Sequence, residues 1–342
     1  MTGVIRHEQA APVVWMFSGQ GVQYFQMGRT LYERNATFRS WMDKLDRVAA
    51  EYAGQSIVET LYDDARPKSQ VFDQILYTHP ALFMVQYAMA KTLLAEGFPP
   101  PDYLFGASLG EFVAAALAGV ADPETMLFDL IRQARLFDAH CGGGAMLLVI
   151  DDVDTFHTDP VFSSGCELAG VNFDGCFAVS GLRSDIHRIA EQLKQRDVTY
   201  QVLPVTIAFH SSLMDGVEEK FNSTFSSKTY RPAAIPIVSC AVSAGAQDFS
   251  AAYWWRVIRQ PIQFRQALGE FQRKHPHAMY LDAGPSGNMA TFTKYNSPAS
   301  AHHKIIPVMM PFGSDDESIE TARRKLAALV VRNTSMGSHD DT

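Results

Sequence analysis

The residues best able to do chemistry in this chain surround Ser108, in the run Gly106-Ala-Ser-Leu-Gly110. This is a G-x-S-x-G pattern, in which a serine lies on a sharp turn between a strand and a helix. Residues 103–105 are apolar, and residues 111–118 have a helical composition. In that setting the hydroxyl lies at a helix N-terminus, where backbone N–H groups can stabilise an oxyanion. The pattern predicts a serine nucleophile, although five residues alone also allow a chance Gly-Ser-Gly turn.

A serine nucleophile needs a base, and two of the eleven histidines are the better candidates. His210 ends an apolar run that begins at Leu203, and active-site residues of α/β folds collect at the ends of such segments. His79 is the second candidate, but its place before Pro80 also suits the start of a helix. From spacing alone, His210 is equally consistent with a partly buried residue that caps the next helix.

The elements that must position these side chains alternate between strands and helices. Strands are predicted at 13–17, 103–106, 236–239, 278–281 and 305–308. Helices are predicted from about 23, and over 37–52, 78–96, 109–119, 123–139, 211–222, 249–257, 261–274 and 317–331. This alternation favours a parallel α/β core assembled from distant segments.

Between residues 144 and 204 the pattern changes to short strands around a single amphipathic helix. The strands are predicted at 145–150, 166–171, 176–180 and 199–203, and the helix at 185–196. This order is typical of a compact α+β insert. We therefore expect a discontinuous large subdomain (1–143 and 205–332), a small subdomain (144–204) and a disordered, polar tail (333–342).

Composition excludes several classes of function. The chain has 342 residues and a net charge of −8, which argues against general nucleic-acid binding. Its four cysteines lack C-x-x-C spacing, so no zinc site or redox pair is indicated, and sparse cysteine fits a reducing cytoplasm. Residues 1–11 have no apolar signal core, and no run is long enough to span a membrane. We expect a cytoplasmic protein without a metal and without nucleic-acid or membrane partners.

Five motifs in order resemble the acyl-carrier-protein acyltransferase family, which includes malonyl-CoA:carrier-protein transacylases and polyketide synthase acyltransferase domains. They are Gly19-Gln-Gly-Val-Gln23, Gly106-Ala-Ser-Leu-Gly110, Ile207-Ala-Phe-His210, Pro261-Ile-Gln-Phe264 and Gly284-Pro285. The resemblance covers about residues 12–330. It implies an α/β fold, with an α/β-hydrolase-like large subdomain carrying a parallel sheet and a small ferredoxin-like α+β subdomain. The insert predicted at 144–204 agrees with it, and we expect a monomer.

The resemblance also implies roles for individual residues. Ser108 would be the nucleophile and His210 its base, oriented by a backbone carbonyl rather than a carboxylate. The backbone N–H groups of Gln20 and Leu109 would form the oxyanion hole, and Gln263 would lie beside the Ser-His dyad.

Substrate-binding roles follow from the same comparison. Asn172 falls where the family often has an asparagine at the cleft edge, and we add His79 and Phe209 to the substrate-binding residues. No bound cofactor is expected, because the substrate is an acyl thioester of CoA or of carrier-protein phosphopantetheine.

This chain departs from the family pattern at three positions around the acyl group. Ala107 replaces the histidine of the usual G-H-S-x-G, and Ile207 stands where malonyl-selective members often have histidine. The arginine that pairs with the malonyl carboxylate follows the family's serine by 25 residues, and here that position is Gln133. Arg132 or Arg135 could replace it only after a local shift of the helix, because two residues along a helix point to another face.

An acyl-serine ester can be resolved by a carrier-protein thiol or by water. The missing arginine resembles the free-standing acyl hydrolases of trans-acyltransferase polyketide systems, which remove stalled acyl groups from carrier proteins. We therefore predict an acyl hydrolase that acts on neutral acyl-carrier-protein thioesters in polyketide biosynthesis. The alternative is a trans-acting acyltransferase that loads a malonyl or neutral unit from CoA. The intact Ser108, His210 and Gln20 turn disfavour a scaffolding pseudoenzyme.

Overall fold

The computed structural model describes residues 11–225, 230–241, 248–312 and 315–336, and its centre is a five-stranded parallel sheet ordered β7-β2-β1-β8-β9. The central strand β1 (Val13–Phe17) pairs with β2 (Tyr103–Gly106) and β8 (Met279–Asp282), while β7 (Ile237–Ser239) and β9 (Ile305–Pro307) lie at the edges. Every residue of β1 is buried and apolar, as expected for a parallel sheet covered on both faces.

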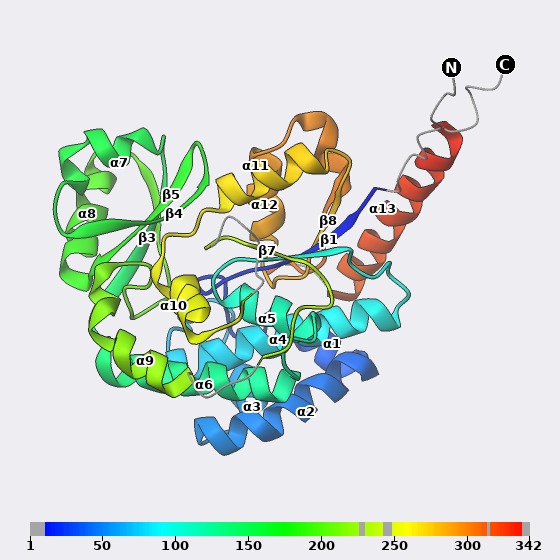
Figure 1. Ribbon diagram of the computed structural model, residues 1–342, viewed down its shortest axis with the longest axis horizontal. Coiled ribbons are helices and arrows are strands. Elements are labelled where there is room, and N and C mark those ends of the chain that lie inside the picture. Colours follow the sequence, from blue (N-terminus) through cyan, green and yellow to red (C-terminus); the bar gives the residue numbers. More distant parts are fainter. Residues whose placement is uncertain (1–10, 226–229, 242–247, 313–314, 337–342) are drawn as a thin grey trace.

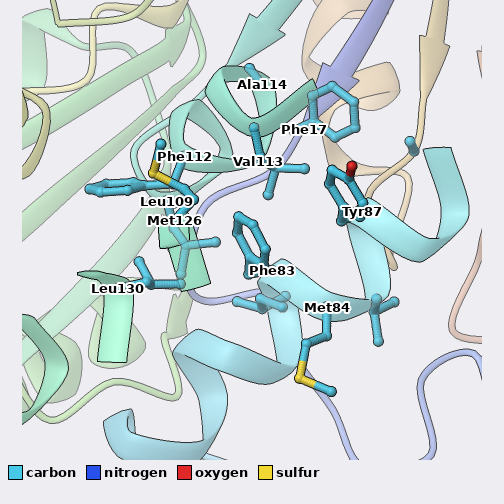
Figure 2. Close-up of a cluster of buried hydrophobic side chains, with 14 of the residues drawn as sticks. Phe17, Phe83, Met84, Tyr87, Leu109, Phe112, Val113, Ala114, Met126 and Leu130 are labelled. Atoms are coloured by element: carbon cyan, nitrogen blue, oxygen red, sulfur yellow. The ribbon is translucent and has the colours of Figure 1, made fainter. Parts of the chain in front are cut away.

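Helices cover both faces of this sheet (Figure 1). Alternate residues of β1 belong to different hydrophobic clusters, because successive side chains of a strand point to opposite faces. One face carries α2 (Ala36–Ala53), α4 (Ile75–Ala95), α5 (Leu109–Leu117) and α6 (Pro123–His140). Figure 2 shows how α4, α5 and α6 pack, with Phe17 of β1 and Phe83, Phe112 and Leu130 of these helices among the buried side chains. The other face carries α11 (Phe264–Lys274) and α12 (Asn288–Tyr295).

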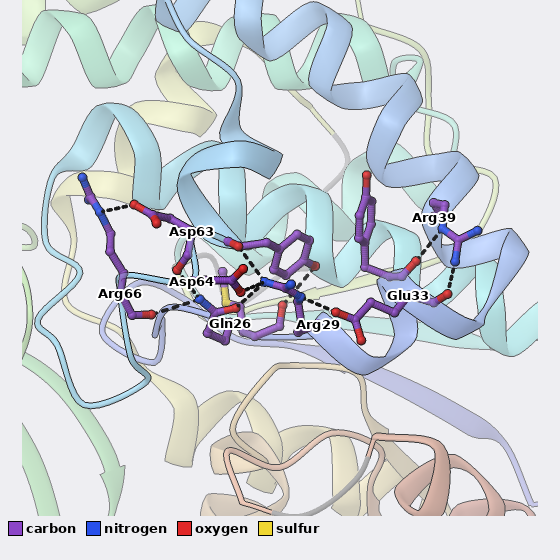
Figure 3. Close-up of polar contacts among 10 residues, drawn as sticks. Gln26, Arg29, Glu33, Arg39, Asp63, Asp64 and Arg66 are labelled. Carbon is purple, nitrogen blue, oxygen red and sulfur yellow. Dashed lines mark hydrogen bonds and ion pairs between the residues drawn. The ribbon is translucent and has the colours of Figure 1, made fainter.

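The segment after β1 differs from the predicted helix that begins near residue 23. Residues 18–28 form turns, and the first helix is α1 (Arg29–Arg34). Gln26 has a φ of 68° and Gly28 a φ of 75°, which no continuous right-handed helix accommodates. The Gln26 amide instead donates to the backbone carbonyls of Asp63 (2.6 Å) and Arg66 (3.0 Å), as Figure 3 shows. These bonds join the turn to the segment after α3 (Ile57–Leu61), a helix that sequence analysis missed.

A second sheet, which is antiparallel, is formed by four strands between residues 144 and 202. They are β3 (Gly144–Ile150), β4 (Cys166–Phe173), β5 (Cys176–Leu182) and β6 (Thr199–Val202), in the spatial order β4-β5-β3-β6. With α7 (Asp154–Thr158) and α8 (Arg183–Gln195), these strands give the β-α-β-β-α-β order of a ferredoxin-like unit. The two sheets together confirm the predicted fold class.

Backbone hydrogen bonds join the two sheets close to the sequence motifs. The Ile262 N–H donates to Ala169 O (2.8 Å), and the Val171 N–H donates to Ile262 O (2.9 Å). Between these bonds, a Cβ added at Gly170 would lie 3.0 Å from Ile262 Cβ. A third bond runs from Gly144 N–H to Thr206 O (3.1 Å). The small subdomain is therefore fixed to the segments that precede His210 and α11.

The remaining elements are α9 (Glu218–Phe225), α10 (Ala251–Arg259), α13 (Asp315–Met336) and the 3₁₀ segments η1 (Pro160–Phe162), η2 (Ser212–Val217) and η3 (Ala299–Lys304). The helix predicted over 211–222 is thus η2 followed by α9. The tail predicted at 333–342 is helical as far as Met336, and residues 337–342 lie outside the described residues. Within the described residues, no helix combines the length and apolar content needed to cross a membrane.

Candidate active site

Ser108 lies in a strained turn between β2 and α5. Its φ of 51° and ψ of −118° fall in a region that residues with a side chain seldom occupy. Glycines on both sides permit this turn. A Cβ at Gly110 would lie 2.0 Å from Phe17 O, and one at Gly106 would lie 2.5 Å from the Glu111 N. The hydroxyl therefore lies at the N-terminus of α5, as the G-x-S-x-G pattern predicts.

The His210 ring connects Ser108 to a backbone carbonyl. Its Nε2 lies 3.1 Å from Ser108 Oγ, and its Nδ1 lies 2.7 Å from the carbonyl oxygen of Gln260, directly after α10. A carbonyl oxygen only accepts hydrogen bonds, so Nδ1 carries the proton and Nε2 presents a lone pair. The serine hydroxyl can donate to that lone pair, which is the arrangement that general-base catalysis requires.

Burial sets the protonation state of His210. The side chain is 2% exposed, and desolvation lowers its pKa to about 4, with the positive charge of Arg259 acting in the same direction. The hydrogen bond to the Gln260 carbonyl opposes this shift. The imidazole is therefore neutral near pH 7 and can accept a proton.

The predicted oxyanion donors lie next to Ser108. Leu109 is the first residue of α5, so its N–H has no acceptor within the helix. On the opposite side, Gly19 packs against the turn so closely that a Cβ there would lie 3.2 Å from Ser108 Cβ. Gln20 follows directly, and both Gln20 and Leu109 line the same cavity as Ser108.

That cavity has a volume of about 470 Å³ and lies between the two subdomains. Five residues predicted to bind substrate line it with Ser108 and His210: His79, Ala107, Gln133, Asn172 and Phe209. Its walls are mainly apolar, with Phe112 from α5 on one side and Met146, Leu148 and Ala178 from the small sheet on the other. An acyl chain attached to Ser108 would lie against these side chains.

Gln133 stands at the position where the family resemblance led us to expect an arginine. It is 1% exposed, on the inner face of α6. Arg132 instead lies over the Phe128 ring with an ion pair to Asp129, and Arg135 is exposed. Neither arginine lines the cavity. The local helix shift that would bring Arg132 or Arg135 into this cavity is therefore not present.

Two predicted positions lie outside the cavity. The Gln263 side chain is exposed, because its neighbours Ile262 and Phe264 turn inward at the start of α11 and line the cavity in its place. Ile207 is buried in the main core while its backbone bridges Gly142, so it contributes no wall to the acyl pocket. In both cases motif spacing located the backbone correctly but not the direction of the side chain.

His79, the second candidate base, is a buried residue of α4 that lines the cavity. Its ring lies 5.7 Å from that of Phe209, and burial lowers its pKa to about 3. Of the two candidates, only His210 has a hydrogen bond to Ser108. His79 therefore remains a candidate binding residue.

Several groups at or next to the site were not predicted from the sequence. The Gln260 carbonyl has no signature in residue type, because every residue has one. Ser286 and Asn288 line the cavity just after the Gly284-Pro285 motif, which could have suggested them. Glu111, in α5, is a buried carboxyl that accepts hydrogen bonds from Ser239, the Cys240 N–H and Tyr253. In the described part of the chain, no group of three or more His, Cys, Asp or Glu side chains could hold a metal ion.

Solved structures share this architecture. A loading acyltransferase from the avermectin modular polyketide synthase matches with a TM-score of 0.82, over 92% of this chain and 99% of its own, at 24% identity. The acyl transferase domain of SpnD, solved with 2-(pent-4-yn-1-yl)malonyl, matches with a TM-score of 0.81 over 92% and 76% of the two chains, at 26% identity. The fold of this chain is thus the fold of polyketide synthase acyltransferase domains.

The chain belongs to the acyl transferase domain family, whose model matches residues 14–328. One relative, the polyketide biosynthesis acyltransferase homologue BaeD of Bacillus velezensis, is 39% identical over 309 residues, which is 90% of this chain and 95% of BaeD. The homologue PksD of Bacillus subtilis is 37% identical over 310 residues, 91% and 95% of the two chains. The resemblance inferred from the five motifs is confirmed.

Proposed function

We propose that this protein hydrolyses neutral acyl thioesters carried by acyl carrier proteins in polyketide biosynthesis. The observation that carries the proposal is the uncharged Gln133 in the cavity beside Ser108, which we call the acyl pocket. Arg132 and Arg135 both lie outside this pocket. The relatives BaeD and PksD are named as acyltransferase homologues of polyketide biosynthesis and match almost over their full length. They support a role in polyketide biosynthesis. The carrier proteins are the expected partners, and the cytoplasm the expected location.

The first half-reaction acylates Ser108. Its Oγ attacks the thioester carbonyl while His210 Nε2 takes the hydroxyl proton, as the 3.1 Å contact allows. The N–H groups of Gln20 and Leu109 stabilise the oxyanion. The C–S bond then breaks, and the pantetheine thiolate takes the proton from His210 as it leaves.

The second half-reaction releases the acid. Water attacks the acyl-serine ester while His210 Nε2 accepts its proton, and the same two N–H groups stabilise the second oxyanion. Collapse of this intermediate returns the proton to Ser108 Oγ and frees the carboxylic acid.

The acyl pocket disfavours a terminal carboxylate. No Lys or Arg is among the described residues that line the cavity. A malonyl carboxylate there would lose its hydration without gaining a cation, which is strongly unfavourable. A glutamine amide supplies at most two uncharged N–H donors from one nitrogen, whereas an arginine offers a charged, bidentate pair. Neutral acyl groups avoid this penalty.

The second candidate function is the loading of carrier proteins from acyl-CoA. The solved relative with a malonyl derivative favours it, because transfer chemistry occurs on the same scaffold. Both functions share the acyl-serine intermediate and differ in the acceptor that resolves it.

Intact-protein mass spectrometry of a carrier protein separates the two functions. Butyryl-carrier protein incubated with the enzyme without CoA should lose its acyl mass, and the Ser108→Ala variant should show no loss above background. In the reverse experiment, holo-carrier with malonyl-CoA or butyryl-CoA should stay unacylated. Rapid loading together with a stable butyryl-carrier would replace hydrolysis by transfer.

A further inference from the structure

Three polar side chains that line the cavity have unused hydrogen-bonding capacity. They come from three elements: Gln20 from the turn after β1, His79 from α4 and Gln133 from α6. The Oε1 atoms of both glutamines and Nδ1 of His79 are buried without a hydrogen-bond partner among the described residues. His79 is 3% exposed and Gln133 is 1% exposed, and all three residues line the cavity.

Ring contacts connect two of these residues to Phe209, the residue before His210: His79 directly, and Gln133 through Phe137. The His79 ring lies 5.7 Å from the Phe209 ring, and the Phe137 ring lies 5.9 Å from it on another side. Gln133 precedes Phe137 by four residues on α6, so the two share a helix face. The Gln20 amide donates to the Thr78 hydroxyl (3.0 Å), next to His79. The cavity therefore has polar groups near Phe209 as well as at Ser286 and Asn288, whereas Phe112, Met146 and Leu148 are apolar.

The chemistry of these atoms selects the group that would satisfy them. An amide oxygen accepts a hydrogen bond, and a neutral imidazole offers one donor and one acceptor. A saturated acyl chain would cover these atoms and leave them unpaired, which is costly for buried polar groups. A carboxylate cannot donate and would bring a charge without a counterion. A hydroxyl both donates and accepts, whereas a keto oxygen only accepts.

We propose that the acyl pocket selects chains that carry an uncharged hydroxyl, bound by Gln133 and His79 with Gln20 beside them. The inference rests on the proposed function, and it names the substrate class as hydroxyacyl thioesters of carrier proteins. Specificity of this kind is large where a buried site is built for a hydroxyl, because the analogue without it leaves protein groups unpaired.

The test compares matched substrates on one carrier protein. Butyryl, 3-hydroxybutyryl, 4-hydroxybutyryl and 3-oxobutyryl thioesters are hydrolysed, and the ratio of kcat/KM for each to that for butyryl is measured. We expect at least one hydroxylated chain to exceed butyryl about tenfold or more, and the keto chain to gain less. Gln133→Met nearly keeps the side-chain volume and His79→Phe keeps a planar ring, and each should bring the hydroxyl ratio towards one. Circular dichroism checks that each variant is folded.

Ser286→Ala is the matched control, because Ser286 also lines the cavity with a buried, unpartnered oxygen but belongs to the turn between β8 and α12 rather than to α4 or α6. This variant should keep the wild-type ratio. Ratios near one for every hydroxylated chain in the wild type would overturn the inference while hydrolysis itself still stands. A ratio that responds to Ser286→Ala and not to Gln133→Met and His79→Phe would also overturn it. Failure to hydrolyse any of the thioesters would instead remove the proposed function.

Discussion

At the scale of single residues, the proposed base His210 is oriented by a backbone carbonyl rather than by a third, acidic side chain. The Gln260 oxygen fixes the His210 tautomer through Nδ1, but it supplies no full negative charge to stabilise the imidazolium. Burial then lowers the His210 pKa to about 4. The His210 imidazole is therefore neutral, and able to accept a proton, at neutral pH and in mild acid.

The lowered pKa of His210 predicts the pH at which activity is lost in acid. A histidine with a lowered pKa is neutral above that pKa, so kcat/KM should be kept as pH falls from 7 to 5 and be lost as pH passes through about 4. Arg259→Gln removes a charge that lowers this pKa and should move the limb to higher pH. The measurement is a pH–rate profile with circular dichroism at each pH. A wild-type limb at pH 6.5 or above, in folded protein, would show that another group is titrating.

The second prediction at this scale concerns the acyl preference set by Gln133. Gln133→Arg should raise the rate of acyl-enzyme formation with malonyl thioesters relative to butyryl thioesters. The guanidinium supplies charge-assisted hydrogen bonds worth about 1.5–3 kcal/mol each, and it meets neutral chains as an unpaired buried charge. The malonyl-to-butyryl ratio should therefore rise about tenfold or more.

Arg135→Gln is the control for that change, because Arg135 lies two residues further along α6 and is exposed. It should leave the ratio as it is in the wild type. An unchanged ratio in a folded Gln133→Arg protein would mean that the acyl chain does not reach α6.

At the scale of elements, one buried carboxyl connects the serine helix to its neighbours. Glu111 of α5 accepts hydrogen bonds from Ser239 Oγ (3.0 Å), from the Cys240 N–H (3.0 Å) and from the Tyr253 hydroxyl of α10 (2.5 Å). Helix α10 ends just before Gln260, whose carbonyl orients His210. The same contacts that hold α5 in place therefore also hold the element that positions the base.

The buried Glu111 carboxyl should lower the free energy of unfolding as pH rises. Burial raises its pKa from 4.5 to about 7, so the folded state binds more protons than the unfolded state between these values. This contribution to the free energy of unfolding is present below about pH 4.5 and is lost as pH rises through 7. Relative to Glu111→Gln, the wild type should lose on the order of 2 kcal/mol between pH 5 and pH 8, measured by urea unfolding. An equal pH dependence of the two proteins would contradict the raised pKa.

Sequence reasoning recovered the elements whose signal is hydrophobic. The apolar runs of β1, β2, β3 and β5 are largely buried, so the positions of these strands were predictable from hydrophobicity. Motif spacing also brought Ser108, His210 and Gln133 to one cavity. It failed for Gln263 and Ile207, because the direction of a side chain depends on local backbone geometry. The helix expected from residue 23 failed because Gln26 adopts a positive φ, held by carbonyls from a distant turn.

At the scale of the whole molecule, the site depends on how the two sheets are joined. The bonds between Ile262 and residues 169–171 fix the small subdomain two residues after Gln260. The cavity is lined from both sides of this junction, by Met146 and Asn172 as well as by Ser108. Movement of one sheet relative to the other would therefore change both the pocket width and the orientation of His210.

Gly170→Val tests this dependence. Its side chain would meet Ile262 at the point where a Cβ alone already lies 3.0 Å away, and it should push the two sheets apart. We expect kcat to fall about tenfold or more, with a modest change in Tm, because the large core is untouched. Gly175→Ala in the β4–β5 turn is the control, since its Cβ would meet only Phe173, at an ordinary 3.4 Å. A normal kcat in folded Gly170→Val would show that the junction does not position the base.

The strand order has a consequence for the protein as it is being synthesised. β1 emerges from the ribosome first, yet one of its two edges stays open until residues 279–282 have been made and can pair with it as β8. In the meantime its apolar residues Val13–Phe17 have a partner only in β2, whereas the small sheet is continuous in the chain and can close as soon as residue 202 emerges. The interval between these events is when the nascent chain is most exposed to aggregation, because an uncovered apolar edge is free to pair with another chain.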